Sequence, residues 1–591
     1  MTWKKRIISI ALCLCALLCA ASVRAEAADE HSHPICGANH TDVGNHTSDT
    51  CSNVTWQAWD GTDTIGYGFF NDSNVKYLYL SRDVEMSDKR TDTIVPEDKT
   101  LYLCLNGHSL TRKANGYTIN VYGTLVLCDC NGSRQGKGVI SHGKKDDGSL
   151  YGADGIYVVD NAIFTMYGGT ISNNDGSGVL VSGGTFTMYG GEISHNTRTT
   201  SSAEGGGGVW VKNYKDPFDS SKEEIPGNFA MYGGTICNNE IQSNVFGGGG
   251  VGMDSDGSFY MENGTITGNK CNNSGGGLDI RCKTITIKDN STISGNTCGG
   301  DGGGIFIDGY AEGSITDCKI ENNAATGSNS MGGGLAFQYS TFTIERCTIT
   351  GNKTAGQGGG IFVLDEKANL TLSSGLEFSG NAQGCTADKN GKLIGGTAND
   401  VFLHIGAYLR LADDFSKTST AAIVVTTFSA PTNKTVKIAE GIAGAAKATD
   451  FTYGNGSNSA IGIIAKTKAD GTTVELLAHK HNYSQKTDSD NHWQECSICK
   501  DKKDVAAHSG GKASCTKKAV CQVCNQPYGG LAAHDYDMTT WVKIDDGHHG
   551  HKCNNCNAID ATSKASHIWD DGEVTTQPKC EETGVKTFTC N

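Results

Sequence analysis

The sequence predicts an all-β protein in which a parallel β-helix, a solenoid of about ten or more coils, is followed by small modules rich in Cys and His. Three observations support this fold class. A glycine-led unit repeats eight times between residues 155 and 381. Apolar residues recur at fixed distances before the polar end of each unit. The region 479–591 carries Cys pairs flanked by His.

Each repeat begins with glycine, continues through two short apolar segments and ends with Ile and a polar stop at Asn. The intervals between stops range from 22 to 43 residues, which suits one β-helix turn of about three short strands. Glycine permits positive φ at the corners and argues against helix. The stops are Asn174, Asn196, Asn239, Asn269, Asn296, Asn323, Asn352 and Asn381.

Side chains before each stop alternate as they do along a strand. The columns ten and eight places before the stop share parity, so they face one side. Helical repeats would need apolar spacings of three and four residues, which are absent. The column ten places before holds Phe164, Phe186, Phe229, Phe259 and Phe342. The column three places before holds Ile171, Ile193, Ile236, Ile266, Ile293, Ile320, Ile349 and Phe378.

Coils of such a helix stack about 4.8 Å apart, so equivalent residues lie above one another. We therefore expect an Asn ladder, in which each side-chain amide bonds to the next. Cysteines fit the same register, because stacked neighbours lie within disulfide range and are either disulfides or stacked buried thiols. The pairs are Cys318 with Cys347, Cys271 with Cys298, and Cys104 with Cys128.

The first 25 residues have the features of a secretory signal peptide. Lys4, Lys5 and Arg6 precede an apolar run, and small residues end at Ala25. We expect a secreted or cell-surface protein with no further membrane-spanning segment. Removal of residues 1–25 changes the net charge from −15 to −19, which disfavours nucleic acid as a partner.

Composition divides the mature chain into four parts. Residues 26–74 form a His- and Cys-containing N-terminal segment, and residues 75–440 form the β-helix with its caps. Residues 441–478 are expected to be a linker, because Gly, Ala and Ser dominate them. Residues 479–591 hold the Cys/His modules. The chain stops inside what looks like another Cys-x-x-Cys, so we expect the natural protein to continue, with cell-wall attachment through the missing part.

Two thiolates on a tight turn with nearby imidazoles suit tetrahedral Zn²⁺. Modules this small need such a staple, because their apolar core is too small. The alternative is that each Cys pair is a disulfide, as is usual in exported proteins. In the sequence, His492 and His508 flank the first pair and His534 follows the second. The candidate ligands are His492, Cys496, Cys499, His508, Cys521, Cys524, His534, His549, Cys553, Cys556 and His567.

The repeats resemble right-handed parallel β-helix proteins of the pectin-lyase-like superfamily. Gly358 to Val363, followed by Phe378 to Asn381, is similar to repeats in surface proteins of gut Firmicutes. The tail resembles the zinc-ribbon-like extracellular modules of those proteins. The resemblance implies a right-handed helix and a bacterial surface location, and it allows either polysaccharide lyases or adhesins.

An enzyme of this kind would need acidic residues on one outward face, as Ca²⁺ ligands or as paired carboxylates. The best candidates fall on neighbouring coils, and Ca²⁺ is a candidate cofactor there. The alternative is a solvated acidic face. The candidates are Asp254, Asp256, Asp279, Arg281, Asp301 and Asp308.

A binding surface has better support. Tyr167, Tyr189 and Tyr232 lie seven places before their Asn, with outward parity. Tyr157 and Trp210 belong to a second outward column, which follows the glycine runs and continues to Phe306 and Phe362. Stacked exposed aromatics would form a platform for a glycan or a surface protein, and an insertion at about 212–227 lies beside Trp210. The alternative is plain stacking between strands.

The sequence therefore favours non-catalytic binding or adhesion by an exported cell-surface protein, with a glycan or a surface protein as partner. A polysaccharide lyase or glycoside hydrolase and a structural stalk without a ligand are the alternatives.

Overall fold

The computed structural model describes residues 31–35, 52–87, 93–130, 138–143, 145, 153–199, 205–428, 435–442, 447–454 and 461–591. The signal peptide expected at 1–25 lies outside these residues. The chain forms two compact units: one extends to residue 456 and includes 463–478, and the other comprises 457–462 and 479–591.

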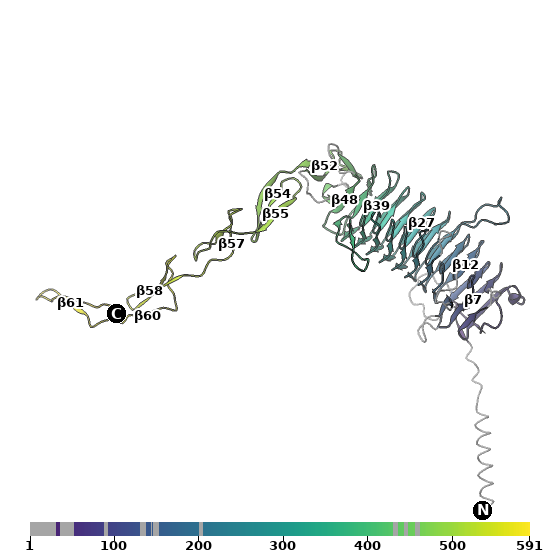
Figure 1. Cartoon of the computed structure of the whole chain (residues 1–591), viewed down its shortest axis with the longest axis horizontal. Coiled ribbons are helices and arrows are strands. Elements are labelled where there is room, and N and C mark those ends of the chain that lie inside the picture. The colour runs from purple at the N-terminus through teal and green to yellow at the C-terminus, as the bar shows by residue number, and fades with distance from the viewer. Residues whose placement is uncertain are drawn as a thin grey trace, which may run out of the picture. The chain divides into compact units, whose positions relative to one another are not determined.

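The first unit is a parallel β-helix, as predicted, with strands of successive coils side by side (Figure 1). Sheet 1 has 16 strands. In chain order they are β3 (Gln57–Trp59), β4 (Val75–Leu80), β7 (Thr100–Cys104), β10 (Thr124–Cys128), β13 (Ile163–Met166), β16 (Thr185–Met188), β20 (Asn228–Met231), β24 (Ser258–Glu262), β28 (Thr284–Lys288), β32 (Glu312–Thr316), β36 (Thr341–Glu345), β40 (Asn369–Leu372), β47 (Leu409–Leu411), β49 (Val436–Glu440), β51 (Ile461–Thr467) and β52 (Thr473–Lys480).

Sheet 2 has 13 strands. They are β6 (Thr93–Val95), β9 (Ile119–Val121), β12 (Ile156–Val159), β15 (Val179–Ser182), β19 (Val209–Lys212), β23 (Val251–Asp254), β27 (Leu278–Arg281), β31 (Ile305–Ile307), β35 (Leu335–Phe337), β39 (Ile361–Val363), β46 (Val401–Leu403), β48 (Ile423–Thr427) and β50 (Phe451–Tyr453).

Sheet 3 has 11 strands and ends each coil at its Ile column. They are β5 (Val84–Met86), β8 (Ser109–Arg112), β11 (Val139–His142), β14 (Thr170–Ser172), β17 (Glu192–Ser194), β21 (Thr235–Cys237), β25 (Thr265–Thr267), β29 (Thr292–Ser294), β33 (Lys319–Glu321), β37 (Thr348–Thr350) and β41 (Glu377–Ser379).

Sheet 4 has eight short strands, and all of them except β45 directly follow an Asn stop. They are β18 (Thr197–Arg198), β22 (Glu240–Ile241), β26 (Lys270–Cys271), β30 (Thr297–Cys298), β34 (Ala324–Ala325), β38 (Lys353–Thr354), β42 (Ala382–Gln383) and β45 (Thr397–Ala398). The remaining elements of this unit are β1 (Ser32–Pro34), β2 (Asn53–Thr55), β43 (Thr386–Ala387), β44 (Leu393–Ile394) and the 3₁₀ helices η1 (Tyr67–Phe70) and η2 (Ala448–Asp450).

The interior of the coils is filled by the predicted columns. The rings of Phe164 and Phe186 stack with centroids 4.7 Å apart, and Phe229 follows 4.9 Å from Phe186. The Ile column from Ile171 to Ile349 is fully buried. Because each coil repeats the same inward residues, one continuous apolar core runs along the helix.

The predicted Asn ladder is confirmed, and all its side-chain amides point the same way. The Nδ2 of Asn239 donates to Oδ1 of Asn269 at 3.0 Å, and Asn269 donates to Asn296 at 3.0 Å. The low-numbered end begins at His142, whose Nδ1 lies 2.7 Å from Oδ1 of Asn174. The high-numbered end is Asn381, which donates to the carboxylate of Asp400 at 2.9 Å.

The C-terminal end of the β-helix differs from the expected linker at 441–478. Strand β50 pairs with β48, and β52 pairs antiparallel with β49, so this segment extends sheets 2 and 1. The Gly- and Ala-rich composition concealed the alternating Val474 and Leu476, which are buried in the core. Strand β52 covers the edge of β49, and β51 pairs beyond it as the last strand of sheet 1.

The second unit consists of small antiparallel hairpins with few buried apolar side chains. Its strands are β53 (Tyr483–Thr487), β54 (Asn491–Cys496), β55 (Lys502–Ala507), β56 (Ala519–Val520), β57 (Pro527–Tyr528), β58 (Tyr536–Lys543), β59 (His548–Cys553), β60 (Ala565–Ser566), β61 (Glu573–Thr576) and β62 (Val585–Thr587).

Candidate functional site

A row of tyrosines stands on the outer face of sheet 1. Tyr167, Tyr189 and Tyr232 directly follow β13, β16 and β20, and their rings stack with centroids 5.0 and 5.1 Å apart. Tyr260, on β24, continues the row at 5.1 Å with a tilted ring. All four side chains are half-buried. We call these four residues the tyrosine row. Partial burial, with Tyr232 alongside, raises the pKa of Tyr189.

The row ends beside charged groups. The Lys288 Nζ lies 5.6 Å from the centre of the Tyr260 ring, and the Tyr260 hydroxyl donates to the Glu262 carboxylate. The repeat pattern did not indicate Tyr260, because it lies nine places before its Asn stop, whereas the other three lie seven places before theirs. Ala230 pairs with Tyr260 on the adjacent strand, and Tyr232 lies two residues after Ala230. Tyr260 therefore faces the same side as Tyr232 and continues the row.

The second outward column does not form the expected exposed platform. Trp210 retains only 5% of its exposure, and Phe306 and Phe362 are also buried. Tyr157 is half-buried, and burial raises its pKa to about 12. The glycine-rich turns fold back over this column: a Cβ at Gly252 would lie 2.7 Å from Cε3 of Trp210. The expectation that Trp210 faces solvent is therefore wrong.

The insertion after β19 forms an exposed loop. Tyr214 and Ile225 pair antiparallel, with the Tyr214 N–H donating to the Ile225 carbonyl at 2.8 Å. Phe218 is 96% exposed in this loop.

The candidate acidic face is only partly brought together. Asp254 and Arg281 occupy paired positions on β23 and β27. Asp279 is 2% exposed, and its Oδ2 accepts a hydrogen bond from the Gly247 N–H at 3.0 Å. The Arg281 Nη2 lies 3.7 Å from the same oxygen. Burial raises the pKa of Asp279 to about 7, although Arg281 opposes the shift, and Asp308 and Asp254 add to it.

The other acidic candidates have separate structural partners. The Asp301 Oδ1 accepts from the Met331 N–H at 2.8 Å, so this side chain holds a turn. Asp256 is exposed and lies 3.4 Å from Lys283. Asp308 accepts from the adjacent Gly309 N–H. These contacts fit a solvated, internally bonded surface.

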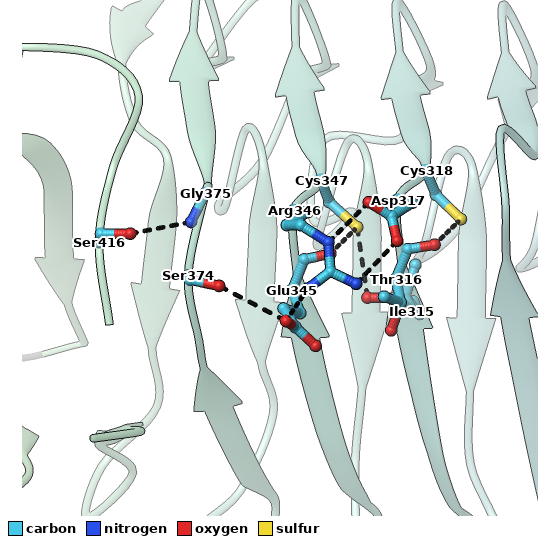
Figure 2. Close-up of polar contacts among 10 residues, drawn as sticks. All are labelled: Ile315, Thr316, Asp317, Cys318, Glu345, Arg346, Cys347, Ser374, Gly375 and Ser416. Atoms are coloured by element: carbon cyan, nitrogen blue, oxygen red, sulfur yellow. Dashed lines mark hydrogen bonds and ion pairs between the residues drawn. The ribbon is translucent and has the colours of Figure 1, made fainter. Parts of the chain in front are cut away.

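Stacked cysteines occupy neighbouring coils as expected from the repeat. Cys271 pairs with Cys298 and Cys104 with Cys128 in strand register, and all are buried thiols. Figure 2 shows Cys318 and Cys347 on adjacent coils, where each thiol donates a hydrogen bond to a backbone carbonyl, that of Thr316 and that of Ile315 respectively. Beside them the Arg346 guanidinium forms two hydrogen bonds to Asp317, at 2.7 and 2.8 Å (Figure 2).

The second unit contains four Cys/His clusters whose donor atoms lie within 4.8 Å of one another. Three have four donors, which fits the tetrahedral set of a structural metal site. The clusters are His479, His481, Cys496 and Cys499; His492, His508, Cys521 and Cys524; Cys515, His534, Cys553 and Cys556; and His549, His567 and Cys590.

The grouping of these ligands differs from the order in the sequence. His492 precedes Cys496 by four residues, yet its Nδ1 lies 3.6 Å from Sγ of Cys521. The Nδ1 of His508 lies 3.3 Å from Sγ of Cys524. His534 in turn lies 3.3 Å from Cys556. His549 and His567, expected at the Cys553 pair, join Cys590 instead. His492 lies near the start of β54 (Asn491–Cys496) and Cys496 at its end, so the two side chains are separated along the strand and serve different clusters.

Four ligands escaped the sequence analysis: His479, His481, Cys515 and Cys590. The signal for the first two was the His-x-His pattern, which places both imidazoles on one face of an extended chain. They complete the Cys496 cluster, with His479 Nε2 3.6 Å from Cys496 and His481 Nδ1 3.4 Å from Cys499.

The Cys-x-x-Cys turns favour thiolates. Desolvation opposes ionisation of Cys496, but the N–H groups of Cys499 and Ile498 point at its sulfur and lower its pKa to about 5. Against desolvation, the N–H groups of Cys524 and Ser509 lower the pKa of Cys521 to about 5, and the Asn555 N–H and the His534 side chain lower that of Cys553 to about 6. Thiolates are the form in which cysteine binds metal.

Comparisons with known proteins support the fold. A family model described as a right handed beta helix region matches residues 228–400. Comparison with curated proteins and with solved structures gave no significant match. Among the described residues, no helix combines the length and apolar character needed to cross a membrane. The first unit is thus a right-handed parallel β-helix, joined in one chain to a unit of Cys/His clusters that could hold metal ions.

Proposed function

We propose that this is an exported cell-surface protein that binds a linear glycan without cleaving it, along the tyrosine row of its β-helix. The observation that carries the proposal is the regular stack of Tyr167, Tyr189 and Tyr232 at 5.0 and 5.1 Å. Stacked rings turn their edges and hydroxyls outward, so the row presents one repeating polar and apolar motif per coil. A polymer that repeats along its own length is the ligand class that can follow such a row.

The Cys/His unit serves as a zinc-stabilised spacer or attachment module. Its donors are thiolate and imidazole, the set that Zn²⁺ prefers, and the three four-donor clusters are complete without a solvent ligand. Bound Zn²⁺ would supply folding free energy to hairpins that bury few apolar side chains. The role is structural, since an open coordination position is what distinguishes catalytic zinc sites.

The competing function is a polysaccharide lyase or hydrolase at the face from Asp254 to Asp308. One observation favours it: Asp279 has a pKa near neutrality beside Arg281, as general acids and bases often do. Against it, the carboxyl is buried and accepts the Gly247 N–H. A polymer would have no direct contact with that oxygen.

A single electrophoresis experiment separates these functions. The mature chain is run on native gels cast with a panel of linear polysaccharides, with Ca²⁺ present. Retardation without loss of the polymer is the expected result. A cleared zone around the band would establish cleavage and overturn the proposal. Unchanged mobility in every gel would also overturn glycan binding and leave a protein partner or a stalk.

A further inference from the structure

The N-terminal segment meets the first coils of the β-helix at a fifth Cys/His cluster. It consists of His31, which directly precedes β1, His33 within β1, Cys104 at the end of β7 and Cys130 just after β10. One donor atom from each residue lies within 4.8 Å of all the others. We propose that this cluster is a structural zinc site that fastens the N-terminal strand to the β-helix.

The donor atoms lie close enough together to surround one ion. The sulfurs of Cys104 and Cys130 are 3.3 Å apart, and Nε2 of His31 is 3.5 Å from the Cys130 sulfur. Bond lengths of about 2.3 Å to sulfur and about 2.0–2.1 Å to nitrogen place two sulfurs roughly 3.8 Å apart and sulfur and nitrogen roughly 3.5 Å apart around Zn²⁺. A disulfide would require about 2.05 Å between the sulfurs.

The tautomer of His33 indicates that its Nε2 atom is a metal ligand. Its Nδ1 lies 2.6 Å from the Pro34 carbonyl oxygen, so Nδ1 carries the proton and donates it. The Nε2 atom then holds a lone pair, yet it is buried and has no hydrogen-bond partner, in a side chain only 6% exposed. A metal-bound His typically donates its second ring nitrogen to a carbonyl in this way.

The two imidazoles are held in place by packing. His33 stacks on Trp56 with ring centroids 4.5 Å apart, and His31 stacks on Tyr79 at 4.0 Å. The indole Nε1 of Trp56 donates to the His33 carbonyl at 3.0 Å, and the backbone N–H of Trp56 donates to the His31 carbonyl at 2.9 Å. A site whose ligands are already oriented loses little conformational entropy on binding.

Zinc here would close large loops in the chain. The strand β1 pairs only with β2 among the described elements, and Cys130 lies 99 residues beyond His31. Cross-links that close long loops remove the most entropy from the unfolded chain. The site would therefore hold the β1–β2 hairpin against the outer face of sheet 1 in the first coils, where Trp56, Cys104 and Cys128 form a small buried cluster.

The test counts metal in the full mature chain, purified without an oligohistidine tag and dialysed after exposure to Zn²⁺. The variants are Cys104→Ser and the double variant His31→Ala with His33→Ala. The matched control is Cys128→Ser, because Cys128 is buried and paired with Cys104 in register but lies outside the cluster. Elemental mass spectrometry should show one zinc equivalent fewer per chain in both cluster variants and no loss in the control.

A second measurement keeps the proposal falsifiable if a variant folds poorly. In the unmodified protein, Zn²⁺ should protect Cys104 and Cys130 from alkylation, and a chelator should expose both together. A peptide pair linked by a Cys104–Cys130 disulfide would overturn the proposal. So would an unchanged zinc count in the cluster variants, or alkylation of both thiols that is independent of the metal.

Discussion

The Nδ1 atom of His492 lies 3.6 Å from Sγ of Cys521, which comes 29 residues later in the chain. His492 shares strand β54 with Cys496, yet the two side chains belong to different clusters. The hairpin of β53 to β55 thus contributes ligands to two neighbouring Cys/His clusters.

This grouping of His492 with Cys521 predicts which thiols lose their protection from alkylation when a His is substituted. His492→Ala should weaken zinc at Cys521 and Cys524 by at least about tenfold and leave Cys496 and Cys499 protected. His481→Ala is the reciprocal control and should expose only Cys496 and Cys499. Alkylation rates of the four thiols, followed by peptide mass spectrometry, measure both. Exposure of Cys496 in the His492 variant would instead support the grouping that follows the sequence order.

Asn269→Ala should destabilise the β-helix by at least about 2 kcal/mol, because buried hydrogen-bonding groups on two neighbouring coils lose their partner. Asn269 donates to Asn296 and to the Ile236 carbonyl and accepts from Asn239. Urea unfolding measures the loss. The control is Asn390→Ala, at an exposed position, which should change the midpoint little. Equal midpoints for both variants would contradict a stabilising ladder.

Trp210→Ala should cost about 3–5 kcal/mol, because a large buried side chain leaves a cavity. Thermal unfolding of this variant should shift clearly downward. Tyr310→Ala is the control, since Tyr310 is 67% exposed. A Trp210 variant as stable as the unmodified protein but defective in binding would restore the original expectation of an exposed ring.

Tyr189→Ala should reduce retardation in the polysaccharide gel at least about fivefold, because it interrupts the middle of the tyrosine row. Tyr189→Phe keeps the ring and removes the hydroxyl, so it separates stacking from hydrogen bonding. Tyr310→Ala again serves as the control, because Tyr310 stacks on Tyr339, away from the row. Equal retardation of all three variants would exclude the row as the binding surface.

Asp279 predicts a pH dependence of stability. Burial raises its pKa in the folded protein to about 7, above the ordinary value of 3.8, so between these values the folded state holds a proton that the unfolded state releases. Stability from this group is therefore fully present below about pH 4 and is lost as pH rises through 7. Asp279→Asn should remove that part of the slope. Urea unfolding of both proteins from pH 4 to 8 checks it, and parallel curves would refute the assignment.

The β-helix could be predicted because its order is periodic. The Ile column, the Phe column and the Asn stops recur at fixed offsets, and a parallel stack turns fixed offsets into contacts. Burial of Trp210 could not be predicted in this way. The alternation of side chains along a strand indicates which side of the sheet a residue faces. It does not indicate whether a turn covers that residue. The path of a glycine-rich turn is set by contacts between backbones, and these leave no side-chain pattern in the sequence.

The Cys/His clusters show a different limit of sequence-based prediction. The Cys-x-x-Cys spacing is local, so the sequence predicts these thiol pairs. Which His residues join each pair depends on how successive hairpins are arranged, and the sequence does not show this. The cluster of His31, His33, Cys104 and Cys130 joins residues up to 99 positions apart and has no short motif. Only the register of β7 and β10, together with the N-terminal strand laid beside them, brings these donors together.

The Asn ladder gives the solenoid a polarity with matched ends. Its acceptor end takes a hydrogen bond from His142, and its donor end meets the Asp400 carboxylate. Each internal Asn accepts a hydrogen bond from the preceding Asn of the ladder and donates one to the next. Deleting the coil of Asn323 would therefore bring Asn296 next to Asn352 and leave both ends of the ladder unaltered. Recombination that removes or adds one repeat would therefore change the length of the β-helix by one coil, about 4.8 Å. The hydrogen bonds at both ends of the ladder would stay the same.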